Sequence, residues 1–220
     1  MKTTGKIINV LGDSITEGAN ATRFECAYHQ ILQKICGFSR VNVYGVGGTR
    51  IAKQTVPSEN QVYDRDFCSR ADDMDRTADI VMVFGGTNDY GHGDAPLGDV
   101  NDRLNDTFCG CCYHLFKNLR DFYPKSDIIV VLPLRRLDDE NPYGEQGKKS
   151  IAMGTLSDYA ERIRQIAVKF AFPVCDLRAE EQLNPNEKES AERYFTDGLH
   201  PNDAGHALLA EKIADFLAKL

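Results

Sequence analysis

The sequence predicts an α/β protein in which helices cover both faces of a parallel sheet. Five short apolar runs, rich in β-branched residues, recur along its 220 residues. Nearly continuous hydrophobicity is typical of strands that are buried on both faces. Between the runs lie segments long enough for the helical crossovers that parallel strands require. We therefore expect one domain over residues 1–220, a three-layer α/β/α sandwich with a five-stranded parallel sheet.

One strand is expected at each apolar run. The runs are Ile7 to Leu11, Val41 to Tyr44, Ile80 to Phe84, Ile128 to Leu132, and Pro173 to Asp176. Crossover helices are expected around Phe24 to Gly37, Leu97 to Tyr123, and Ile151 to Ala171. Two segments, Gln54 to Gln61 and Leu137 to Lys149, show neither pattern and are expected to be loops.

A last helix is expected near the C-terminus. Pro201-Asn202-Asp203 is typical of a helix start. After it, apolar side chains recur at helical spacing, which predicts an amphipathic helix that packs on the sheet. These side chains are Leu209, Ile213, Phe216, Leu217 and Leu220.

The charge balance argues against nucleic acids and anionic membranes as partners. The chain has 26 Lys and Arg against 33 Asp and Glu, a formal net charge of −7. Such a surface repels phosphate groups unless a local basic patch overrides it. The strongest candidate patch, Arg135-Arg136, is followed by the acidic residues 138–140, which predicts a solvated loop. Small neutral molecules are the more suitable substrates.

The seven cysteines favour a reducing compartment, because they are odd in number and fall mostly in segments expected to be buried. Cys109, Cys111 and Cys112 form a C-x-C-C cluster without a second ligand pair at zinc-like spacing, so core packing is expected, with no metal and no cofactor.

The apolar run after Met1 to Gly5 is too short for a secretory signal, and no run reaches membrane-spanning length. A cytoplasmic protein is expected.

A serine lies on the turn after the first strand, in Gly12-Asp13-Ser14-Ile15-Thr16-Glu17-Gly18. Taken alone, a serine in such a turn is more often a helix cap than a nucleophile. Near the C-terminus, Asp197 precedes His200 by three residues. That spacing lets the carboxylate hold one ring nitrogen while the other points at a nucleophile. The alternative is an exposed turn in which Asp197 only caps local backbone.

Other histidines and acids compete for these roles. His92 follows Asn88 closely and could line the same pocket, but no acid supports it as a base. His29, His114 and His206 fall on expected helices and are expected to be structural or exposed. Asp176, at the end of the fifth apolar run, is the alternative orienting acid. Asp13 and Asp89 are expected to brace the turns that hold their neighbours.

Two glycine-rich turns follow the second and third strands, Gly45-Val46-Gly47-Gly48-Thr49 and Gly85-Gly86-Thr87-Asn88-Asp89. Glycine lets the backbone approach a ligand closely, so the turns suit an oxyanion site. Tight strand-to-helix turns are the alternative. A dinucleotide fingerprint and a P-loop are absent.

Together these segments resemble the SGNH hydrolases, also called the GDSL lipase and esterase family, which have a flavodoxin-like fold. Ser14 lies in Gly-Asp-Ser-Ile-Thr, Gly48 and Asn88 match the second and third blocks, and Asp197 and His200 match the final Asp-x-x-His. The blocks occur in the family's order and span most of the chain. The family usually has Leu where this chain has Ile15, a conservative difference.

The resemblance implies an enzyme that cleaves carboxylic esters through an acyl-enzyme intermediate. Ser14 would be the nucleophile, His200 the base and Asp197 its orienting acid. The oxyanion hole would comprise the backbone N–H groups of Ser14 and Gly48 and the side-chain amide of Asn88. A small acyl ester is the expected substrate. An acyltransferase on the same scaffold and a non-catalytic flavodoxin-like binding module are the alternatives.

Overall fold

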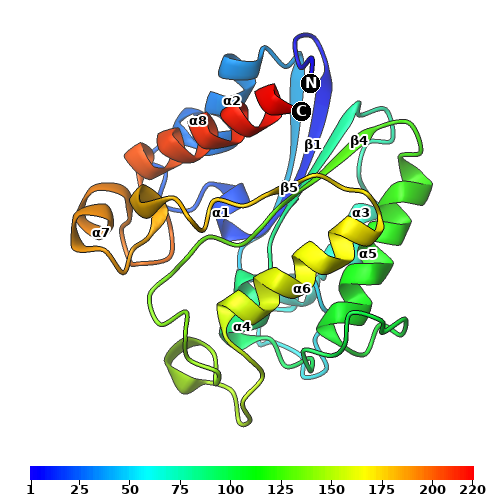
Figure 1. Ribbon diagram of the computed structural model, residues 1–220, viewed down its shortest axis with the longest axis vertical. Coiled ribbons are helices and arrows are strands. Elements are labelled where there is room, and N and C mark those ends of the chain that lie inside the picture. The colour runs from blue at the N-terminus through cyan, green and yellow to red at the C-terminus, as the bar shows by residue number, and fades with distance from the viewer.

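The computed structural model describes all residues 1–220 and contains a five-stranded parallel sheet (Figure 1). The strands are β1 (Ile7–Gly12), β2 (Arg40–Gly45), β3 (Ile80–Phe84), β4 (Asp127–Val131) and β5 (Val174–Cys175). They lie in the order β2-β1-β3-β4-β5, and every neighbouring pair is parallel. The predicted fold class is therefore confirmed. Because the order reverses between β1 and β3, their carboxyl ends open a crevice suited to a ligand.

Helices cover both faces of the sheet (Figure 1). On one face lie α2 (Tyr28–Cys36) and α8 (Asp203–Lys219), and on the other α3 (Phe67–Ala71), α5 (Phe108–Phe122) and α6 (Leu156–Lys169). Side chains of a strand alternate between its faces. Accordingly Ile80, Met82 and Phe84 pack with the first group of helices, and Val81 and Val83 with the second. This double burial explains why β3 is apolar throughout.

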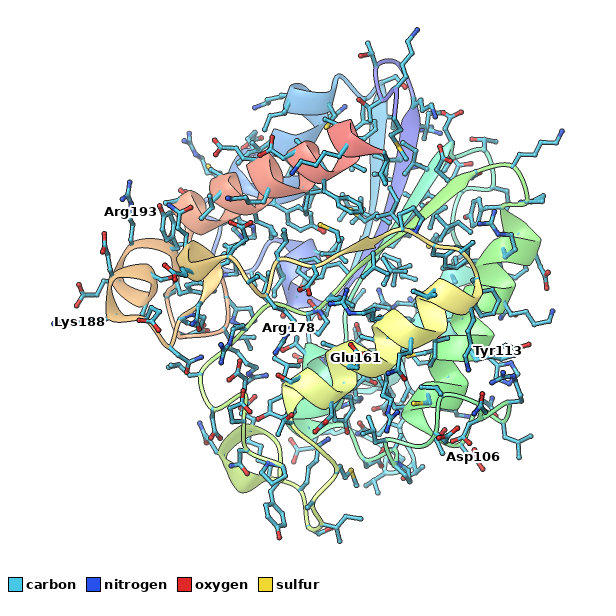
Figure 2. All side chains as sticks on the ribbon, viewed as in Figure 1. Asp106, Tyr113, Glu161, Arg178, Lys188 and Arg193 are labelled. Carbon is cyan, nitrogen blue, oxygen red and sulfur yellow. The ribbon has the colours of Figure 1, made fainter.

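Helices α5 and α7 (Lys188–Tyr194) and strand β5 are among the elements that differ from the sequence prediction. Helix α5 begins at Phe108 and not near Leu97, because Thr107 caps it by accepting a hydrogen bond from the Gly110 N–H at 3.0 Å. Strand β5 pairs over two residues only. Helix α7 was not predicted, since it is mostly charged and lacks an apolar stripe. Its residues Lys188 and Arg193 point away from the sheet (Figure 2).

The cysteine cluster is part of the core. Cys109, Cys111 and Cys112 are buried on α5, and all seven cysteines are free thiols. Burial raises the pKa of the Cys109 and Cys111 thiols to about 11. The expected packing role is therefore confirmed. None of the helices has the length and apolar character needed to span a lipid bilayer.

The predicted solvated loop at Arg135-Arg136 is wrong. The Arg136 side chain is buried and donates to the Glu145 carboxylate at 2.6 Å and to the Thr87 hydroxyl at 3.4 Å. Arg135 donates to the buried Asp139 carboxylate at 3.0 Å. The neighbouring acidic residues therefore do not indicate exposure, since one of them pairs with an arginine at the edge of the core.

The short helix α1 (Ser14–Glu17) lies directly against the ends of β1 and β2. A Cβ atom on Gly45 would be 2.2 Å from the Glu17 nitrogen and 2.4 Å from the Thr16 carbonyl carbon. A Cβ atom on Gly12 would be 2.0 Å from the Thr16 hydroxyl oxygen. Both positions require glycine, because the α1 backbone at Gly45 and the Thr16 side chain at Gly12 occupy the place of a Cβ atom.

The substitution Gly45→Ala should destabilise the protein by about 1–3 kcal/mol, as expected for overpacking against backbone that has little room to move. Urea unfolding followed by circular dichroism measures this change. Gly5→Ala is the control, since a Cβ atom there meets nothing within 4 Å and only its positive φ opposes the change. A Gly45→Ala protein no less stable than Gly5→Ala would contradict the packing described here.

Candidate active site

Ser14 is the first residue of α1, at the carboxyl end of the central strand β1. Asp13 caps this helix, and its carboxylate accepts a hydrogen bond from the Ile15 N–H at 3.0 Å. Gly18 ends the helix in the left-handed conformation, with φ of 98°. The result is a tight turn that holds the Ser14 hydroxyl at the rim of the sheet.

The C-terminal Asp-x-x-His segment meets Ser14 at this rim. The Ser14 Oγ atom lies 2.9 Å from Nε2 of His200, although the two residues are far apart in sequence. The Nδ1 atom of His200 lies 2.7 Å from the Asp197 carboxylate. The sequence-predicted trio of serine, histidine and aspartate is therefore a continuous hydrogen-bonded chain.

Asp197 is held in place by its own turn. Its carboxylate accepts hydrogen bonds from the backbone N–H groups of Leu199 at 3.0 Å and of His200 at 2.8 Å, besides the imidazole. Burial alone would raise the pKa of the Asp197 carboxyl, but these hydrogen bonds outweigh it and lower the pKa below its ordinary value. The group is thus an anion that fixes the His200 ring.

The two glycine-rich turns lie beside Ser14. Gly48 has φ of 71°, and its N–H group donates to no other group of the protein. Asn88, in α4 (Thr87–His92), is buried and uses its amide to donate to the Thr49 carbonyl at 2.9 Å. One N–H bond of that amide is thereby occupied, and the other remains available. Ser14, Gly48 and Asn88 all line one cavity.

Two buried carboxyls brace these turns, as the sequence suggested. Asp89 accepts hydrogen bonds from the Ile51 N–H at 2.9 Å and the Ala52 N–H at 2.8 Å, which ties α4 to the segment after β2. Burial raises the pKa of Asp89 to about 6, and it does the same for Asp13. For Asp13 the Ile15 N–H and the nearby His200 lower the pKa in part.

Three further bracing residues were missed by sequence reasoning. The Glu17 carboxylate accepts a hydrogen bond from the Gly47 N–H at 3.0 Å, next to Gly48. Arg70 is buried and donates to the Tyr44 carbonyl at 2.6 Å and to the Thr49 hydroxyl at 2.8 Å. Arg50 is likewise buried. Nothing in the local sequence signals the burial of Arg50 and Arg70, so only the fold identifies these two residues.

The cavity in front of Ser14 has a volume of about 870 Å³. The predicted loop from Leu137 to Lys149 forms one wall, through Leu137, Asp138, Glu145, Gln146 and Lys148. Hydrogen bonds to neighbouring helices hold this wall in place. The buried Lys149 ammonium donates to the Asp89 carbonyl at 2.7 Å and to the Tyr159 hydroxyl at 2.9 Å.

The competing candidates lie elsewhere or have other partners. Asp176 pairs with Arg164 on α6 and does not contact His200. His29 and His206 are buried and His114 bonds the Arg103 carbonyl at 2.7 Å, which agrees with structural roles for these three. His92 lines the cavity, as predicted, and contacts Arg50.

Residues 10–208 match the family model described as the GDSL-like Lipase/Acylhydrolase family. The chain belongs to the GDSL-like lipase/acylhydrolase family. Membership in this family indicates a hydrolase that acts on esters in general. The residues that carry the predicted resemblance, from Ser14 to His200, all fall within the matched segment.

Solved structures resemble this GDSL-like chain over nearly its whole length. A protein from Lactobacillus plantarum is 29% identical, with a TM-score of 0.83 over 99% of this chain and 98% of the other. A carbohydrate acetylesterase family member from Sinorhizobium meliloti is 15% identical, with a TM-score of 0.65 over 97% of this chain and 98% of the other. The second likeness is one of fold. A search among curated proteins gives no match.

The buried Asp13 carboxyl should make stability depend on pH. Its pKa is about 6 in the folded chain against an ordinary value of 3.8, so its contribution to stability falls as pH rises from about 4 to about 6. Asp13→Asn removes this titration and keeps an oxygen for the Ile15 N–H. Relative to the wild type, the variant should gain up to about 3 kcal/mol between acidic and neutral pH.

Urea unfolding of both proteins at several pH values between 4 and 7 measures the difference. The comparison isolates Asp13, since the other buried titratable groups are common to both proteins. Parallel stability curves would contradict the assignment of a raised pKa to this carboxyl.

Proposed function

We propose that the protein hydrolyses small carboxylic esters through an acyl-enzyme intermediate on Ser14. The observation that carries this proposal is the hydrogen-bonded chain from the Ser14 hydroxyl through His200 to Asp197, at 2.9 and 2.7 Å, with its serine at the cavity. A base that is oriented by an anion and bonded to a serine is the arrangement that activates a hydroxyl.

In the acylation step the two nitrogens of His200 have different roles. Its Nε2 atom takes the proton as Ser14 Oγ bonds to the ester carbonyl carbon, and Asp197 stabilises the imidazolium from the Nδ1 side. When the tetrahedral intermediate collapses, the bond to the alcohol oxygen breaks and His200 returns the proton to that oxygen. Water then repeats the sequence on the acyl-enzyme and releases the acid.

Negative charge develops on the carbonyl oxygen during both steps. The backbone N–H groups of Ser14 and Gly48 and the free N–H of the Asn88 amide are the donors we propose for it. Two observations support this choice of donors. All three residues line the cavity, and the Gly48 N–H has no acceptor within the protein. The bond from Asn88 to the Thr49 carbonyl holds its amide in one orientation.

The lining of the cavity favours short, polar esters. Only 5 of its 19 lining residues are hydrophobic, namely Val46, Val62, Tyr63, Leu137 and Leu199. The polar groups among the other residues can hydrogen-bond to a polar alcohol part. An acetyl or similarly short acyl group on a polar alcohol is the substrate class that fits.

Active-site labelling tests the nucleophile. A fluorophosphonate probe should modify Ser14, as found by peptide mapping, because only an activated serine reacts with it. Ser14→Ala should abolish labelling, and both Ser14→Ala and His200→Ala should reduce the hydrolysis of phenyl acetate by about 10⁴-fold or more. The exposed Ser39 provides the control, so Ser39→Ala should label and turn over normally. Hydrolysis that survives in Ser14→Ala would sink the proposal.

Kinetics of an oxyanion-hole variant test the Asn88 role. Asn88→Ala should lower kcat by about 100- to 1000-fold with a small change in KM, because the lost hydrogen bond strengthens only as the oxyanion forms. Circular dichroism checks that the fold is retained. A variant in which KM rises and kcat is unaltered would place Asn88 in ground-state binding instead.

Adding an alcohol to the assay separates hydrolysis from acyl transfer. A hydrolase forms free acid as its main product even when a short alcohol is present at high concentration. A new ester as the main product would favour the acyltransferase alternative, with the same nucleophile.

A further inference from the structure

His92 is a histidine of the cavity wall that the proposed reaction does not use. It is the last residue of α4, one helical turn after Asn88. Residues four apart lie on the same helix face, and both side chains line the cavity. Its hydrogen-bond partner is an arginine and not a carboxylate. His92 is therefore not a catalytic base that an acid orients.

Arg50 determines which ring nitrogen of His92 carries the proton. The Nη1 atom of Arg50 lies 2.9 Å from Nδ1 of His92. A guanidinium has only donors, so Nδ1 must accept and the ring proton is on Nε2. Burial, together with the charge of Arg50, lowers the pKa of His92 to about 4, which keeps the ring neutral at physiological pH.

Arg50 is itself held firmly. Its side chain is 4% exposed, and its Nη2 atom donates to the Tyr63 carbonyl at 2.9 Å and contacts the Asp64 carboxylate at 3.5 Å. A guanidinium fixed by partners on the segment after β2 cannot turn away from the ring. The neutral form with the proton on Nε2 is therefore built into the fold.

The Nε2–H group of His92 has no acceptor in the protein. It forms no hydrogen bond with any side chain or backbone group. The Nε2 atom of His29 also has no partner, but that atom is buried, whereas the Nε2 atom of His92 is accessible to solvent. A fixed donor that faces a cavity without a partner is suited to an oxygen of a bound molecule.

The charges of the cavity wall favour a neutral oxygen over an anionic one. The cations Arg136 and Lys148 are both paired with Glu145, at 2.6 and 2.7 Å. Asp138, which lines the same cavity, adds negative charge. An anionic group of a ligand would find no free cation here, whereas a hydroxyl, ether or carbonyl oxygen needs only a donor.

We propose that His92 is a substrate-binding residue whose Nε2–H donates to a neutral oxygen of the ester outside the scissile carbonyl. Arg50 is the positioning residue that makes this ring a donor. The inference rests on the proposed ester hydrolysis and extends it to the class of substrate, an ester that carries a further neutral oxygen in its acyl or its alcohol part.

Two matched pairs of esters test the proposal. Phenyl butanoate and phenyl β-hydroxybutanoate differ by an oxygen in the acyl part, and cyclohexylmethyl acetate and an acetylated methyl glucoside differ in the oxygens of the alcohol part. In His92→Leu, kcat/KM should fall by about 3- to 10-fold for the oxygen-bearing member of one pair, the size expected for one neutral hydrogen bond. The oxygen-free members should change less than about twofold.

The pair that responds identifies which part of the ester His92 contacts. His92→Gln keeps an N–H donor and should recover part of the loss. His114→Leu makes the same chemical change outside the cavity and should leave all four esters unaffected. The proposal would be overturned if His92→Leu lowered kcat/KM equally for the two esters of each pair. It would also be overturned if kcat/KM fell for none of the four esters.

The ring proton can be observed without any substrate. In a long-range proton–nitrogen NMR spectrum at neutral pH, the His92 signals, assigned by their loss in His92→Gln, should show the proton on Nε2. Arg50→Met should give a mixture of the two neutral forms and the same selective loss in kcat/KM. A wild-type ring protonated on Nδ1 would overturn the proposal whatever the kinetics of the His92 and Arg50 variants.

These outcomes are distinct from failure of the proposed function. If Ser14 resists the fluorophosphonate probe, ester hydrolysis by this serine is wrong, and the NMR result on His92 is unaffected. If Ser14 reacts while the paired esters do not discriminate, the hydrolase proposal stands and the role of His92 is wrong.

Discussion

The contact between the backbone of α1 and Gly45 sets the position of the whole candidate site. No side chain fits between them, so the turn that holds Ser14 cannot shift along the rim of the sheet. Because parallel strands all end at this edge, the segments after β2 and β3 arrive beside Ser14 without long connections. The C-terminal turn with Asp197 and His200 then needs only to reach over the same rim.

Around this fixed turn, charged groups are buried to hold loops and not to react. The buried Asp89 binds two backbone N–H groups and the buried Arg70 binds a carbonyl and a hydroxyl, while the exposed Glu17 carboxylate binds the N–H of Gly47. Buried charges are unfavourable unless they are well paired. The pairs found here hold the segments that carry Gly48 and Asn88 in place beside Ser14.

The sheet and the meeting of the motifs were predictable from the sequence, and the bracing residues were not. An apolar run such as Ile80–Phe84 indicates a strand that is buried on both faces of the sheet. Parallel topology then brings the segments after the strands to one edge. Burial of Arg50 and Arg136 depends on partners 13 and 9 residues further along the chain, which no local sequence pattern indicates. For the same reason the sequence wrongly predicts a solvated loop at Arg135-Arg136, and the charged helix α7 has no periodic pattern that predicts it.

The wall formed by residues 137–149 has a consequence for how ligands enter. Lys149 holds it from behind through α4 and α6, and Arg136 pairs with Glu145 within it. A wall secured in this manner is a permanent part of the cavity and not a lid that must open. Association is then a single encounter with a preformed surface, and selectivity among ligands depends on shape and hydrogen bonding at first contact.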